Sequence, residues 1–107
     1  MCIVIAPTVS PANVTRDHIV RLEDLPNIGK AGAADLRLIG IDRPAQLPGQ
    51  QPWQMYRTLC EVTGQRHDPC VIDVFMSVVN FMEGADPLPW WAYTSERKAR
   101  MLDGSFA

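Results

Sequence analysis

Three side chains in the middle of the sequence could bind a metal ion or carry out sulfur chemistry: Cys60, His67 and Cys70. As metal ligands they supply only three donors, whereas a structural zinc ion is held by four. Cys70 follows Asp68-Pro69, a typical helix start, and a thiol at a helix N-terminus can have a lowered pKa and form a reversible disulfide with Cys60. The commoner role of such thiols, and the one we expect, is that of small apolar groups in the core. The spacing leaves these interpretations open.

Catalysis by these residues would need more than the sequence offers. A nucleophile made of Cys70 and His67 requires a third group to orient the imidazole, and none can be named. The sequence contains no glycine-rich phosphate loop, dinucleotide fingerprint or metalloprotease motif. We therefore expect a protein that is not an enzyme and needs no cofactor.

The stretch Pro26-Asn27-Ile28-Gly29-Lys30 could bind an anion through its backbone. Pro26 fixes one φ angle, Asn27 tolerates the left-handed conformation, and Gly29 lets the chain lie close to a partner. The first N–H groups of the following helix would point outward, as at helix N-termini that bind phosphate, and Lys30 would add a positive charge. The alternative is a structural turn that only joins two helices.

Aromatic side chains near the C-terminus offer a possible partner surface. Trp90 and Trp91 are adjacent and follow Pro87 and Pro89, which exclude a regular helix before them. Aromatic residues in such places can stack on bases or bind a protein, but they more often pack on the core. Three basic residues further on are expected to form a solvent-exposed end rather than a binding arm: Arg97, Lys98 and Arg100.

Helices must position these groups. Capping residues and apolar spacing predict helices over residues 16–24, 29–39, 52–63 and 69–82, and a last helical turn within residues 95–102. Gly40 and Gly64 suit helix ends, and Asp42 can cap a short turn that begins at Pro44. The helix after Pro69 is apolar on nearly every side, which indicates the buried centre of the domain.

The buried face of the helix over residues 29–39 follows from its apolar spacing. Ala31, Ala34 and Leu38 lie three and four residues apart and share a face with Ile28. In the preceding helix, Ile19, Leu22 and Val20 should face inward, and Thr15 is the expected N-cap.

The stretch from Pro26 to Lys30, here called the hairpin, resembles the helix-hairpin-helix motif. The turn of that motif is usually Pro-Gly-Ile-Gly, and Asn27 stands here in place of the first glycine. Further motifs follow it in order: residues 34–41, residues 56–60, the stretch beginning Asp68-Pro69-Cys70 and ending at Phe75, and Trp90-Trp91. This succession, over residues 20–93, resembles the pathogenicity-locus family of small helix-hairpin-helix proteins, some of which are labelled mitomycin resistance proteins. The resemblance implies a compact all-α fold and a role with DNA, without naming an activity. The arrangement is also similar to the C-terminal domains of bacterial RNA polymerase α subunits.

A short internal repeat in the sequence suggests a second hairpin. Leu47-Pro48-Gly49 stands 22 residues after Leu25-Pro26-Asn27. The residues that follow lack an Ile-Gly pair, and Pro52 lacks an N–H donor, so we do not expect a second phosphate site there.

The charge balance limits any binding to DNA. The net charge is −2, and the bases and acids between residues 15 and 41 are equal in number. Since nonspecific affinity depends on the number of phosphates that are neutralised, one hairpin with Lys30 predicts weak, strongly salt-dependent binding.

The sequence therefore predicts an all-α protein: a compact bundle of about five helices with a helix-hairpin-helix (SAM-like) core. Residues 1–14 should form an irregular arm and residues 15–107 a single domain. The expected function is sequence-independent binding to the backbone of double-stranded DNA. The alternative is a module of the same fold that binds a protein or a second copy of itself. No apolar run is long enough for a membrane span, and no secretion signal is evident, so we expect a cytoplasmic protein without a membrane role.

Overall fold

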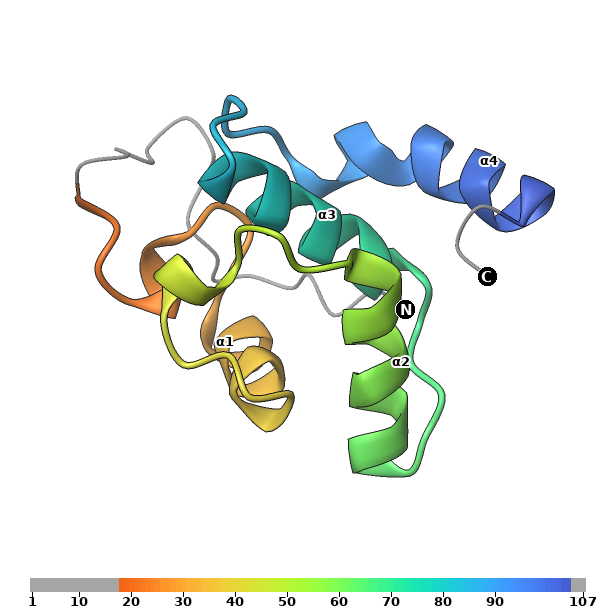
Figure 1. The fold of residues 1–107 in the computed structure, drawn as a ribbon, viewed down its shortest axis with the longest axis horizontal. Coiled ribbons are helices and arrows are strands. Elements are labelled where there is room, and N and C mark those ends of the chain that lie inside the picture. Colours follow the sequence, from red (N-terminus) through yellow and green to blue (C-terminus); the bar gives the residue numbers. More distant parts are fainter. Residues whose placement is uncertain (1–17, 105–107) are drawn as a thin grey trace.

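The computed structural model describes residues 18–104, which form four α-helices and three 3₁₀-helices and contain no β-strand (Figure 1). The α-helices are α1 (Lys30–Leu38), α2 (Pro52–Thr63), α3 (Cys70–Met82) and α4 (Thr94–Asp103). The 3₁₀-helices are η3 (Leu22–Asp24), η4 (Pro44–Gln46) and η5 (Trp90–Tyr93). The predicted all-α fold is confirmed. The expected arm over residues 1–14 and the cap at Thr15 lie outside the described residues.

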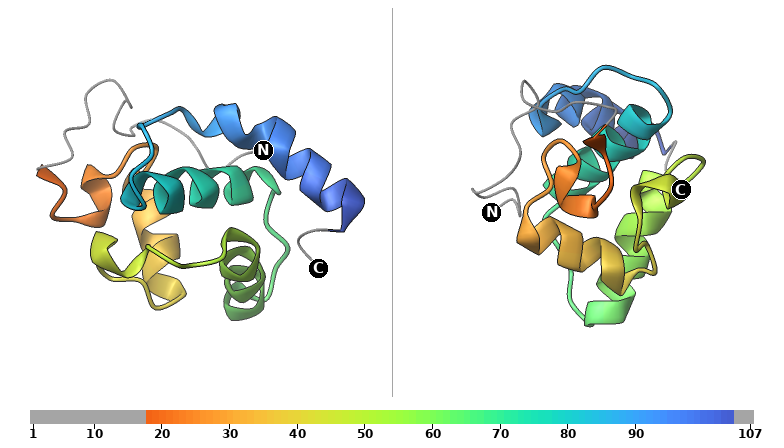
Figure 2. Two further views of the ribbon diagram at one scale, coloured as in Figure 1. Left: turned by 45° about the horizontal axis from the view of Figure 1, so that its top comes forward. Right: turned by 90° about the vertical axis from the view of Figure 1, so that its left-hand side faces the viewer.

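Helix α3 is the centre of the core, as its composition predicted. Every residue from Val71 to Val79 is buried. Figure 2 shows α3 between α4 and the pair formed by α1 and α2. Its start also follows the prediction, because Asp68 Oδ1 accepts the N–H of Cys70 at 2.8 Å and Pro69 has helical dihedral angles.

Helices α1 and α2 end as their glycines predicted. Gly64 ends α2 with a φ of +68°. At the end of α1, Gly40 has a φ of +90°, and the N–H of Ile41 donates to the carbonyl of Leu36 at 2.9 Å. This bond and the one from the N–H of Gly40 to the carbonyl of Arg37 form a Schellman motif.

The helix expected over residues 16–24 is wrong for its described part. Residues 19–21 are not helical, and only the short turn η3 follows them. The reason is local: Asp24 Oδ2 accepts the N–H groups of Val20 and Arg21, at 3.1 and 2.8 Å, and so caps a turn that begins at Leu22. Leu22 is nevertheless fully buried, and Ile19 packs against the core, as expected. The expectation for Val20 is wrong, because its side chain is 75% exposed.

The predicted buried face of α1 is also wrong. Ala31 and Ala34 are exposed, and Leu38 is half exposed. The core-facing residues are Gly32, Ala33 and Leu36. Leu36 and Leu38 are two positions apart and therefore lie on different faces of α1. The prediction placed Leu38 on the buried face, whereas Leu36 is the leucine that packs into the core. Ile28 sets the true orientation, because its side chain lies against Gly32, where an added Cβ would meet it at 3.3 Å.

Two segments 22 residues apart have the same order and spacing of elements. η3 and η4 begin at positions 22 and 44, and α1 and α2 begin at positions 30 and 52. Gln46 caps η4 as Asp24 caps η3, because its Oε1 accepts the N–H groups of Asp42 and Arg43 at 2.7 and 2.8 Å. The expected cap from Asp42 is therefore wrong, because this residue donates a backbone hydrogen bond to the cap instead. The short sequence repeat thus corresponds to a repeated order of elements in the structure.

Candidate functional site

The predicted hairpin is a tight turn with a buried base. The N–H of Ile28 donates to the carbonyl of Leu25 at 3.4 Å, and Asn27 has a φ of +66°. With proline second and a left-handed residue third, this is a type II turn. Leu25 and Ile28 are buried, at 0% and 1% exposure. The turn leads through Gly29 directly into α1.

Asn27 anchors this turn to distant parts of the chain. Its side-chain Nδ2 donates to the carbonyl of Leu88 at 2.8 Å and to Ser77 Oγ at 3.1 Å. Ser77 Oγ donates in turn to the carbonyl of Val74 at 2.6 Å. Asn27 is thus 5% exposed, and its side chain holds the turn in place. The sequence held no signal for these contacts, which come from α3 and the segment after it.

The N-terminus of α1 is the exposed part of the hairpin. Pro26, Asn27 and Ile28 are buried, Gly29 is partly buried, and Lys30 is exposed. No side chain caps α1, and its first turn contains no acidic residue. The helix N-terminus therefore has a partial positive charge that no carboxylate of its first turn neutralises, which is a local setting that suits an anion.

Acidic side chains neutralise the other bases around the hairpin. Arg21 pairs with Asp24 at 3.4 Å, and Arg37 pairs with Glu23 at 3.2 Å. A backbone hydrogen bond lowers the pKa of Glu23, and Arg37 lowers it further. Of the three basic side chains described between residues 18 and 41, only Lys30 has no ion pair with a described residue.

The two adjacent tryptophans have different environments. Trp90 packs against the core, whereas Trp91 is 63% exposed. Their rings meet edge to face with centroids 5.6 Å apart. Only Trp91 is thus placed for an outside partner, and Leu88 nearby in the chain is 42% exposed.

Cys60 and His67, two of the three residues proposed for sulfur or metal chemistry, hold the connection between α2 and α3, whereas Cys70 is in a disulfide with a partner other than Cys60. Cys60 has a free thiol, so the structure contains no Cys60–Cys70 disulfide. Its Sγ accepts the N–H of His67 at 3.5 Å, and His67 Nε2 lies 2.8 Å from Thr63 Oγ1. Over residues 18–104, no three His, Cys, Asp or Glu side chains are grouped to hold a metal ion.

A hydroxyl completes this cluster. Tyr56 donates a hydrogen bond to the carbonyl of His67. Burial is the main cause that raises the pKa of Tyr56, and a hydrogen bond with Cys60 raises it further. The hydroxyl therefore remains a neutral donor at physiological pH, which suits a structural contact.

The basic end expected to be solvent-exposed contains a buried ion pair. Arg97 is 7% exposed, and its Nε lies 2.9 Å from Oδ1 of the fully buried Asp73. Thr94 Oγ1 donates to the other carboxylate oxygen at 2.7 Å. The expectation for Arg97 is wrong. It assumed that arginine is usually exposed and did not foresee that Asp73 of α3 provides a buried partner.

Comparisons with known proteins agree with the resemblance seen in the sequence. A family model described as "Pathogenicity locus" matches residues 15–99. The chain is 43% identical over 83 residues to the mitomycin resistance protein McrB of Streptomyces lavendulae, and the match covers 78% of each chain. No solved structure matches the chain. None of the helices within residues 18–104 is both long and apolar enough to cross a membrane.

Proposed function

The chain belongs to the pathogenicity-locus family, and from this premise we propose that it is a non-catalytic binding module for double-stranded DNA. It contacts the sugar-phosphate backbone through the N-terminus of α1 and Lys30, without base-specific contacts. One observation carries the proposal: α1 begins without a side-chain cap, without an acidic residue in its first turn and beside an exposed lysine.

The rigidity of the hairpin supports this proposal. Leu25 and Ile28 are buried on either side of the turn, and Asn27 is held by two hydrogen bonds. A phosphate would therefore meet N–H groups whose directions are already set, and little conformational entropy would be lost on binding.

The charge distribution sets the strength of the interaction. Because Arg21 and Arg37 are paired with acids, Lys30 is the hairpin base available to a phosphate. Each neutralised phosphate contributes a slope of about −0.9 to the dependence of log K on log salt. We expect weak binding with a slope of about −1 to −2, measurable at low salt.

Fluorescence anisotropy of a labelled DNA duplex at several salt concentrations tests the proposal. Wild type should bind at low salt and lose affinity as salt rises, and Lys30→Glu should abolish the binding. Lys98→Glu is the matched control, since it makes the same charge change at an exposed lysine of α4. The proposal fails if wild type does not bind at low salt, or if both variants lose affinity equally.

A second candidate function rests on Trp91, whose side chain is 63% exposed. In this alternative, the same fold binds a protein or a second copy of itself and has no role with nucleic acid. Analytical ultracentrifugation of wild type and Trp91→Ala tests self-association. The alternative predicts a complex that Trp91→Ala weakens, that Lys30→Glu leaves intact, and that salt affects little.

The name of the Streptomyces relative adds a biological expectation. That protein is called a mitomycin resistance protein, and we propose the same trait for this chain. If the trait depends on backbone binding, cells that express Lys30→Glu should tolerate mitomycin less well than cells that express Lys98→Glu.

A further inference from the structure

The Leu47–Gln50 turn repeats the central part of the Leu25–Ile28 turn, although the residues that begin them differ: Leu25 is extended with a ψ of 151°, and Leu47 is helical with a ψ of −37°. Each turn has proline in second place and a left-handed third residue, with a φ of +66° at Asn27 and +86° at Gly49. The N–H of the fourth residue donates to the carbonyl of the first, at 3.4 Å in one turn and 3.0 Å in the other. The leucine that begins each turn is fully buried. Each turn leads into a helix that has no side-chain cap and no acid in its first turn.

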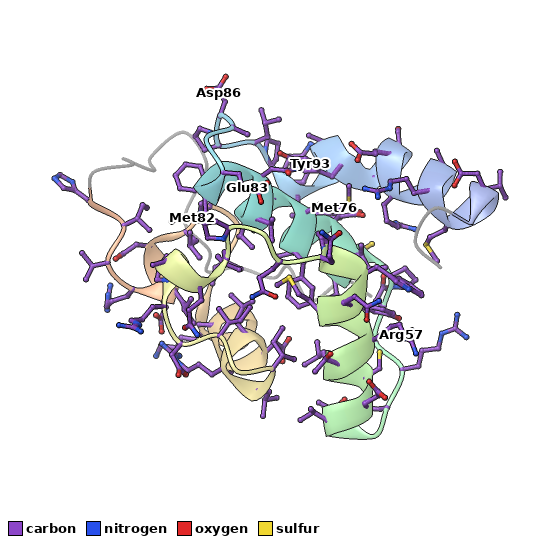
Figure 3. The ribbon with its side chains drawn as sticks, in the orientation of Figure 1. Arg57, Met76, Met82, Glu83, Asp86 and Tyr93 are labelled. Carbon is purple, nitrogen blue, oxygen red and sulfur yellow. The ribbon has the colours of Figure 1, made fainter. Side chains whose placement is uncertain are left out.

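The second turn already holds an anion. The N–H of Gly49 donates to Glu83 Oε2 at 2.7 Å, a length typical of a charge-assisted hydrogen bond. Glu83 directly follows α3, and Figure 3 shows its carboxylate directed toward the segment that leads into α2. The equivalent N–H in the first turn belongs to Asn27, and no carboxylate among residues 18–104 accepts a bond from it.

We propose that the Leu47–Gln50 turn is an oxyanion site that Glu83 keeps closed. The carboxylate occupies the position that a phosphate oxygen would take at the Gly49 amide, and its negative charge repels an approaching phosphate. The duplicated structure thus has one turn whose third N–H bonds to no carboxylate among residues 18–104, here called the open turn, and one turn filled by the chain itself. The choice of a phosphate oxygen as the ligand rests on the proposed function.

The site differs from its counterpart in ways that fit a closed state. Lys30 follows the first turn, and its equivalent in the second is Pro52, which provides neither a charge nor an N–H group. Without Glu83, the second turn would retain the Gly49 amide and the N-terminal end of α2. We therefore expect that opening this site gives weaker phosphate binding than the first turn provides.

NMR titration of the ¹⁵N-labelled full chain with inorganic phosphate, at constant ionic strength, tests this inference. In Glu83→Ala, the Gly49 amide signal should shift saturably with phosphate. In wild type, the same signal should not respond. Asp86→Ala is the matched control, because Asp86 is an exposed acid three residues further on and points away from the turn in Figure 3; its Gly49 signal should behave as in wild type.

Glu83→Gln separates the charge from the hydrogen bond. Its amide oxygen can still hold the Gly49 N–H, so this variant should respond to phosphate more weakly than Glu83→Ala and more strongly than wild type. The inference is overturned if Gly49 stays silent in both variants while their other amide signals overlay those of wild type. It is also overturned if Asp86→Ala responds as Glu83→Ala does.

The same spectra separate this inference from the proposed function. The amides of residues 27–30 report on the open turn, whereas Gly49 reports on the closed one. If only residues 27–30 respond, the proposed function stands and the closed site is refuted. If Gly49 responds in Glu83→Ala while residues 27–30 never do, the first turn is not an anion site and the closed-site inference alone survives.

Discussion

The Nε atom of Arg97 lies 2.9 Å from Oδ1 of Asp73, in an ion pair that is almost completely removed from water. Nη2 of the same guanidinium approaches the other carboxylate oxygen at 3.5 Å, and Thr94 donates to that oxygen at 2.7 Å. The pair connects α4 to the first turn of α3. Because a buried charge without its partner is costly, this contact controls whether α4 stays docked.

Arg97→Met should therefore be strongly destabilising, because it leaves the Asp73 carboxylate buried with only Thr94 as a donor. Removing one partner of a buried pair costs about 3 to 5 kcal/mol of unfolding free energy. Urea denaturation measures the loss. Lys98→Met on the exposed face of α4 is the control and should change stability by no more than about 0.5 kcal/mol. The double variant Asp73→Leu/Arg97→Met should regain most of the loss, and equal effects of the two single methionine variants would contradict this account.

Substitutions at Asn27 should separate its backbone role from its side-chain role. Asn27→Gly keeps the left-handed conformation but loses the bonds to Ser77 and Leu88, which should cost about 1 to 3 kcal/mol. Asn27→Ala loses the same bonds and adds the strain of a positive φ, about 1 to 2 kcal/mol. Chemical denaturation should rank wild type first, glycine second and alanine last. A glycine variant as stable as wild type would show that the amide bonds contribute nothing.

The caps formed by Asp24 and Gln46 should contribute to stability with different pH dependences. The backbone N–H of Arg21 is the largest cause that lowers the pKa of Asp24. A carboxyl with a lowered folded pKa stabilises the fold above its unfolded pKa, near 3.9, and loses this contribution as pH falls through the folded value. Asp24→Asn should thus be less stable than wild type at pH 6, and the difference should shrink as pH falls toward 2. Thermal unfolding at both values measures it.

Gln46 provides the control for that experiment, since its amide accepts the equivalent bonds and does not titrate. Gln46→Ala should cost about 1 kcal/mol at either pH. If both caps show the same pH dependence, the titration of Asp24 is not the cause.

The elements that the sequence predicted well are those determined by near neighbours. Asp68-Pro69 marked the start of α3, Gly64 the end of α2, and the apolar composition of α3 its central place. In each case the residues that decide the structure lie within one helix or directly beside its end. Such local preferences can be seen without knowing the fold.

The failures have the opposite cause. Arg97 was expected to be exposed because its partner, Asp73, lies 24 positions away on another helix. Asn27 has the left-handed conformation that was expected, but the bonds of its side-chain amide to residues 50 and 61 positions further along were not foreseen. The buried face of α1 depended on Ile28 packing against Gly32, which the apolar spacing alone did not reveal. Tertiary contacts decided all three.

The long reach of the Asn27 amide also has a consequence for how the hairpin can be used. The turn lies near the start of the described chain, but the groups that hold it lie in α3 and beyond, so contacts of high sequence separation must close before the turn is fixed. We therefore expect that the hairpin does not keep its structure when it is separated from the rest of the chain. A peptide of residues 20–40 would contain every residue of the turn and neither of the partners that hold Asn27 in place.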